Sequence, residues 1–156
     1  MTLVTDAPAT ARPTWRRPLG VATAVYGCFL AFVLLEPSNN VPSSSIAWLS
    51  VRLAAHGVPT VLSGYAYVDF WCNIAIMLPL AAALVFLWPR VRWERWTVIA
   101  FALSAGVETT QSLLLPSRVP AFSDVVANTL GVLLGSGAAA FAWWVGTRGA
   151  GESFGG

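Results

Sequence analysis

The sequence predicts an all-α integral membrane protein with four transmembrane helices and a short amphipathic helix in the outer loop between the first two. Of its 156 residues, 56% are hydrophobic and only 10% are charged, whereas soluble domains average about 45–50% apolar and about 25% charged residues. The apolar residues fall into four runs near the length of about 20 residues that crosses a hydrocarbon core. These runs leave no room for a second domain.

Each expected span is bounded by charge, proline or tryptophan, and the four lie at Leu19–Leu35, Val68–Trp88, Trp96–Leu115 and Val125–Val145. The first run is not interpreted as a secretory signal, because no A-x-A cleavage pattern follows it and three more spans do. One transmembrane domain is therefore expected over residues 19–145, with a disordered tail at 1–18 and a polar tail at 146–156.

The arginines predict the orientation, because cytoplasmic loops carry an excess of basic residues. Two arginines, Arg52 and Arg118, lie on one side of the spans, and seven lie on the other: Arg12, Arg16, Arg17, Arg90, Arg92, Arg95 and Arg148. Both termini are therefore expected in the cytoplasm. The arginines are scattered among loops and tails, so no nucleic-acid partner is expected.

The outer segment between the first two spans runs from Glu36 to Tyr67. Its apolar residues Ile46, Leu49 and Leu53 recur at helical spacing, which predicts a short amphipathic helix over Ile46–His56 on the outer membrane surface. His56, the single histidine, is interpreted as a polar residue of this interface. No regular element is predicted for residues 58–67.

Polar side chains interrupt the last three spans at similar depth. Each span carries them at helical spacing, so that each presents one polar seam: Asp69 and Asn73; Ser104, Glu108 and Gln111; Asp124 and Asn128. An acidic side chain at the centre of a membrane helix costs about 2.5–3.5 kcal/mol, so Glu108 is expected to face the bundle. Arg118, in the next outer loop, is expected to contact Glu108 or Asp124.

Two interpretations of this polar group stay open. As a staple, it would hold the helices in register, each hydrogen bond contributing about 0.6–2 kcal/mol. As a ligand or reaction site, it would explain three carboxylates and a cation at one depth, because such residues inside membranes mark functional sites. Asp69 and Asp124 can also be helix-start residues favoured by the macrodipole.

Other features predict packing rather than chemistry. Gly131 and Gly135 form a GxxxG step that lets another helix approach closely, either the span at 68–88 or another subunit in a homodimer. Cys28 and Cys72 lie in apolar spans and indicate neither a disulfide nor a zinc site. A divalent cation bridging Asp69, Glu108 and Asp124 is chemically reasonable, but no metal-ligand spacing is present, and neither a metal nor a cofactor is expected.

The run SAGVETTQSLLLPSRVPAFSDVVANTLGVLLG, residues 104–135, resembles the hallmark stretch of VanZ-like membrane proteins: E-x-x-Q, a following Arg, and D-x-x-x-N-x-x-G-x-x-x-G. Residues 73–79 resemble the second-helix motif of that family, with Met77 and Ala81 standing where Phe and Gly are common. The resemblance covers about residues 69–137. It implies a four-helix protein of the bacterial plasma membrane, in a family named after a member associated with resistance to the glycopeptide teicoplanin.

Two functions are therefore carried forward. The first is a binding protein of the cell envelope whose outer-leaflet site takes a polar lipid head group, a lipid-linked wall precursor or a glycopeptide, with Arg118 facing its phosphate or carboxylate. The second is a small membrane enzyme acting on such a lipid, with Glu108 or Asp124 as general acid or base. Transport ranks below both, since four helices offer little pathway.

Overall fold

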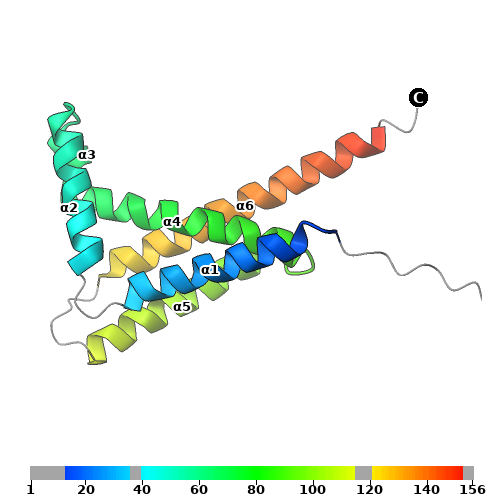
Figure 1. Cartoon of the computed structure of the whole chain (residues 1–156), viewed down its shortest axis with the longest axis horizontal. Helices are drawn as coiled ribbons and strands as arrows, with labels where there is room; N and C mark the ends of the chain where they lie inside the picture. The colour runs from blue at the N-terminus through cyan, green and yellow to red at the C-terminus, as the bar shows by residue number, and fades with distance from the viewer. Residues whose placement is uncertain (1–12, 36–39, 115–120, 153–156) are drawn as a thin grey trace, which may run out of the picture.

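The structure is a computed structural model that describes residues 13–35, 40–114 and 121–152. Within these ranges the chain is all helical, as the sequence predicts, and forms six helices (Figure 1). They are α1 (Arg16–Leu35), α2 (Asn40–Ala55), α3 (Thr60–Ser63), α4 (Tyr65–Leu87), α5 (Trp93–Leu114) and α6 (Phe122–Glu152).

The four long helices form a bundle, and α2 stands across one end of it (Figure 1). α1 and α5 run in one direction, and α4 and α6 run in the opposite direction. α6 packs most extensively on α4 and next on α5, whereas α1 packs against α4. We call the end at which α4 and α6 begin the α2 end. The opposite end, where α1 and α5 begin and α6 ends, is the arginine end, and it carries Arg16, Arg17, Arg90, Arg92, Arg95 and Arg148.

Two helices of the described chain are long and apolar enough to cross a membrane. They are α4, with 23 residues, and the 27 residues Phe122–Arg148 of α6, and at 1.5 Å per residue each exceeds a hydrocarbon core of about 30 Å. The other two expected spans form α1 and α5, which do not meet this criterion over their described residues. α1 opens with two arginines, and α5 carries Glu108 and Gln111 in its second half.

All four long helices begin three residues before the expected spans, so that residues 16–18 of the expected tail are helical, and α2 begins at Asn40 instead of Ile46. α4 begins at Tyr65 instead of Val68, directly after the short α3, in a segment for which no regular element was predicted. α6 continues past the predicted end at Val145 to Glu152, although residues 146–152 include three glycines, which disfavour a helix. α6 therefore projects beyond the other helices at the arginine end (Figure 1).

The amphipathic helix predicted over Ile46–His56 is present as α2. Its apolar residues Ile46, Leu49 and Leu53 are half-buried, and α2 packs on the start of α4. The opposite face of α2 exposes Trp48 and Val51, whose side chains are 61% and 68% accessible. The seam that predicted the helix therefore faces the protein, and a second apolar face points outward.

The GxxxG step of α6 lies directly against the backbone of α4. A Cβ atom built on Gly131 would lie 2.6 Å from the carbonyl oxygen of Ile74, and one on Gly135 would lie 2.5 Å from that of Leu78. The sequence left two partners open for this step, the span at 68–88 and another subunit. In the structure the partner is the span of the same chain, which forms α4. A homodimer through these glycines would have to displace α4.

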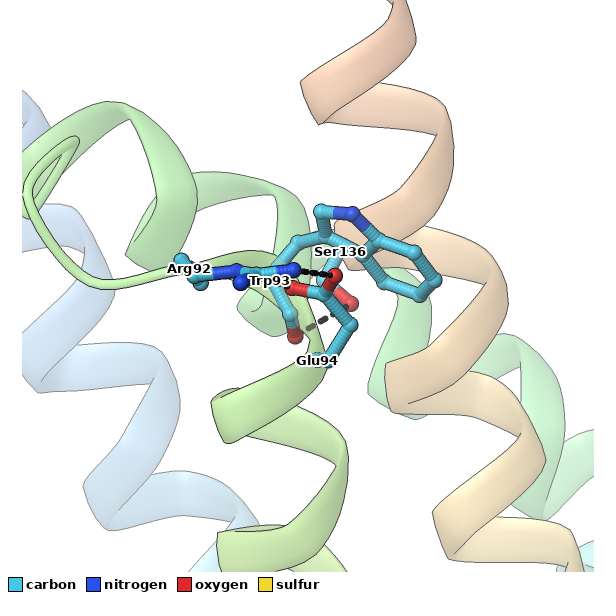
Figure 2. Close-up of polar contacts among 4 residues, drawn as sticks. All are labelled: Arg92, Trp93, Glu94 and Ser136. Carbon is cyan, nitrogen blue, oxygen red and sulfur yellow. Dashed lines mark hydrogen bonds and ion pairs between the residues drawn. The ribbon is translucent and has the colours of Figure 1, made fainter.

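Polar contacts link α5 and α1 to neighbouring helices away from the α2 end. At the arginine end, the hydroxyl of the fully buried Ser136 donates to the carbonyl oxygen of Val132 in its own helix at 2.6 Å, and it also lies 3.4 Å from the carbonyl oxygen of Trp93 at the start of α5 (Figure 2). In the middle of the bundle, the Tyr26 hydroxyl of α1 donates to the carbonyl oxygen of Ile76 in α4 at 2.8 Å. This bond lies close to Pro79, which lacks the N–H that an α4 carbonyl would otherwise receive.

Tyr26→Phe should lower the free energy of unfolding by about 1 kcal/mol, because it removes one interhelical hydrogen bond and little apolar area. The measurement is unfolding of the purified protein in mixed detergent micelles. Thr23→Val is the control, since the Thr23 hydroxyl bonds to Leu19 within α1 itself. Equal stability of Tyr26→Phe and wild type would mean that this hydroxyl does not hold α1 on α4.

Candidate functional site at the α2 end

The polar residues singled out in the last three spans lie at the α2 end of the bundle. α4 and α6 both begin there and α5 ends there (Figure 1), so the three polar seams open toward the same region. Gln111 and Asn128 are 5% and 6% exposed, and Ser104 is 9% exposed. Asp69, Asn73, Glu108 and Asp124 are half-buried.

Glu108 joins the end of α5 to the start of α6. Its Oε2 atom accepts a hydrogen bond of 3.1 Å from the backbone N–H of Ala121, the residue just before α6 begins. The first N–H groups of a helix have no partner within it, and they favour a negative charge. Glu108 therefore caps α6 from a neighbouring helix, which is a staple contact as well as a way to hold the carboxylate in place.

Asn128 and Ser104 form a second, deeper link between α5 and α6. The Asn128 side-chain N–H₂ group donates to the Ser104 hydroxyl at 3.1 Å. The Asn128 Oδ1 atom is buried and accepts no hydrogen bond from any described residue. Burying such an acceptor without a donor costs about 1–3 kcal/mol. A donor from outside the described residues would remove this cost.

Asp69 brings α4 into the same group. Asn73 donates to Asp69 Oδ1 at 3.5 Å, one turn along the helix. Asp69 is also near enough to Asp124 for the two carboxylates to repel each other. Asp124 in turn accepts from the Ser123 hydroxyl at 3.3 Å.

The helix-start interpretation separates these two aspartates. Asp124 lies in the first turn of α6, where the macrodipole favours it. Asp69 does not lie in the first turn of α4, because that helix begins earlier than predicted, at Tyr65. The macrodipole thus accounts for Asp124 and not for Asp69, whose position near a second carboxylate has no such explanation.

The metal-bridging alternative does not fit the geometry. No three His, Cys, Asp or Glu side chains among the described residues are grouped closely enough to hold a metal ion. The carboxylates of Asp69, Glu108 and Asp124 therefore do not form a three-ligand site. His56 is exposed, and its Nδ1 atom lies 2.7 Å from the carbonyl oxygen of Arg52, so the ring is used to close the end of α2.

One predicted contact lies outside the described residues, because Arg118 falls in the segment 115–120. Two features of this end were not found from the sequence. The backbone N–H of Ala121 carries no side-chain signal, so its bond to Glu108 could not be read from residue types. A shallow groove of about 450 Å³ lies along α2 and is lined by Ser44, Ser45, Trp48 and Leu49, none of which was a site candidate.

An all-helical bundle with membrane-length apolar helices and a polar cluster at one end defines the class of this protein. The chain belongs to the VanZ/LLP1 family, whose model matches residues 21–143, a range that includes α4, α5 and every polar residue of the cluster. No curated protein and no solved structure matches the chain.

Proposed function

We propose that this protein spans the bacterial plasma membrane four times and uses the polar cluster at the α2 end to bind the polar head group of an envelope lipid, a lipid-linked wall precursor or a glycopeptide. The cluster comprises Asp69, Asn73, Ser104, Glu108, Gln111, Asp124 and Asn128. In this proposal both termini are cytoplasmic, and the cluster lies in the outer leaflet.

The outward faces of the bundle support the membrane location. α1 exposes Val25, Phe29 and Phe32 at 54–66%, and α5 exposes Phe101 and Leu103 at 51% and 66%. A soluble monomer rarely exposes a contiguous apolar surface on this scale, whereas a lipid environment solvates it. The same environment accounts for four spans, although α5 is less apolar than the other three long helices.

The charge distribution supports the orientation. Six described arginines lie at the arginine end, counting Arg148 of α6, and the described part of the α2 end carries Arg52. Because an excess of arginine marks the cytoplasmic side, the arginine end is proposed to face the cytoplasm. α2 would then lie along the outer surface, with Trp48 and Val51 in the interface.

The observation that carries the binding proposal is the buried, unpartnered Oδ1 atom of Asn128 beside a carboxylate-rich cluster. A pure staple would pair its polar atoms within the protein, since an unpaired buried acceptor weakens it. Carboxylate, amide and hydroxyl oxygens together suit a ligand that donates hydrogen bonds, such as the hydroxyl or amino groups of a sugar or amine head group. Arg118 would add a cation for its phosphate or carboxylate.

Native mass spectrometry of protein purified in detergent from its own membranes tests this proposal. Wild type is expected to carry a defined lipid, wall precursor or glycopeptide, whereas Glu108→Gln and Arg118→Ala should each retain at least about tenfold less. That ratio corresponds to the loss of one charge-assisted hydrogen bond. Glutamine at position 108 can still accept from Ala121, so the cap on α6 should survive.

Glu94→Gln is the matched control, because it neutralises a carboxylate at the arginine end. It should carry the same ligand as wild type, after all variants have been checked for equal folding. If all four proteins carry the same ordinary phospholipids in equal amounts, the binding proposal is wrong and the cluster is a staple.

An enzymatic role is the second candidate, and the proximity of Asp69 and Asp124 favours it. Two carboxylates in different surroundings are a common way to provide an acid and a base at neutral pH. In this role Asp124 or Glu108 would transfer the proton and Arg118 would stabilise developing negative charge. Turnover of the isolated ligand by wild type and its absence in Asp124→Asn would separate an enzyme from a binding protein.

A further inference from the structure

The arginine end carries an excess of positive charge, and it lies at the opposite end of the bundle from the polar cluster. Five arginines are placed there by the start of α1, the α4–α5 turn and the first turn of α5: Arg16, Arg17, Arg90, Arg92 and Arg95. Among side chains that the structure describes at this end, Glu94 is the one carboxylate. These side chains together carry a charge of +4, twice the chain's total of +2.

Two of these arginines are already engaged. Arg16 donates to the carbonyl oxygen of Leu87 at the end of α4, where a helix leaves its last carbonyl groups unpaired. Arg92 forms an ion pair with Glu94 at 2.6 Å (Figure 2). The hydrogen bond from Arg92 holds the pKa of Glu94 below its ordinary value, so the carboxylate stays ionised and offsets this arginine.

Arg17 and Arg90 are left without a hydrogen bond or ion pair to the described chain, and both are exposed, as is Arg95. Aromatic side chains accompany them. Trp88 is 51% exposed and packs on Trp96 at 6.1 Å between ring centroids. Tryptophan beside arginine is typical of the depth at which lipid head groups lie.

We propose that the arginine end binds the phosphate groups of anionic phospholipids in the leaflet that it faces, through Arg17, Arg90 and Arg95. Guanidinium groups match phosphate oxygens in geometry and charge, and each basic side chain near an anionic surface adds about fivefold to the affinity. The site is independent of the polar cluster at the other end of the bundle.

Titration of the full-length protein in neutral detergent micelles tests the proposal. Added dioleoylphosphatidylglycerol should raise the Tm in a dose-dependent way, and dioleoylphosphatidylcholine, with the same acyl chains, should not. Arg90→Gln should weaken the apparent affinity for phosphatidylglycerol about fivefold, and Arg17→Gln/Arg90→Gln roughly 25-fold. Raising NaCl to about 0.5 M should shrink the effect, because salt screens exposed charges.

Arg52→Gln is the matched control, since it removes an exposed arginine at the α2 end. Its Tm should respond to phosphatidylglycerol as wild type does, and so should that of Glu108→Gln. Equal stabilisation by the two lipids would overturn the proposal. An equal loss of affinity in Arg52→Gln and Arg90→Gln would also overturn it, because the effect would then follow net charge rather than this end of the bundle.

Discussion

Gly131→Ala and Gly135→Ala should each lower the free energy of unfolding by about 2 kcal/mol or more, among the largest effects expected from so small a change. The added Cβ would lie 2.5–2.6 Å from a carbonyl oxygen of α4 in both cases, well inside van der Waals contact. A flexible side chain could turn away, but the carbonyl groups of Ile74 and Leu78 are fixed by their own helix. α4 and α6 would therefore have to separate, and overpacking of this kind costs about 1–3 kcal/mol.

Gly106→Ala provides the matched control for that measurement. Gly106 lies within α5 and is exposed, and a Cβ atom there would meet nothing within 4 Å. Alanine should stabilise the helix by about 0.5–1 kcal/mol, because glycine loses more backbone entropy on folding. Unfolding in detergent–SDS mixtures compares the three variants. If Gly131→Ala were as stable as wild type, the close approach of α4 and α6 would not exist in solution.

The class of fold follows from composition and period, whereas the helix ends do not. Four apolar runs with charged or aromatic borders predict four long helices, and all four are present. All four long helices begin three residues before the predicted spans, and only Gly64 separates the start of α4 at Tyr65 from the end of α3 at Ser63. Tertiary contacts contribute to such boundaries, since α2 and α3 both contact α4 and lie at the end where it begins (Figure 1).

The outer helix shows what spacing can and cannot specify. Ile46, Leu49 and Leu53 predicted a helix, and α2 contains all three. Spacing also suggested that this face would meet the membrane, but it is half-buried against the protein. A row of apolar residues along a helix indicates only that an apolar surface covers it. Lipid and protein can provide that surface equally well.

The polar group at the α2 end was predictable as a set of residues but not as a network of bonds. Helical spacing gathers Asp69 and Asn73, or Asp124 and Asn128, on one face each, so their common depth follows from the sequence. The partners do not follow from it. Glu108 caps α6 through a backbone N–H, and Asn128 bonds to Ser104 of α5. Both contacts depend on the register of α5 against α6, which the sequence pattern does not specify.

Asn128→Leu should separate the two interpretations of this group most sharply. Leucine has the same branched arrangement of heavy atoms as asparagine, and it removes both the hydrogen bond to Ser104 and the cost of the unpaired Oδ1 atom. These two contributions are of similar size and opposite sign, and the free energy of unfolding should change by less than about 1 kcal/mol. Retention of the co-purified ligand, measured by native mass spectrometry, should instead fall at least about tenfold, because the buried acceptor is lost.

The competing outcome is equally specific. If Asn128 serves only to hold α5 on α6, Asn128→Leu and Ser104→Ala should both destabilise the bundle, and a double-mutant cycle between them should give a coupling of about 0.6–1.7 kcal/mol. Ligand retention would then be unchanged in whatever fraction stays folded. A large loss of stability in Asn128→Leu, combined with full ligand retention, would therefore contradict a binding role for Asn128.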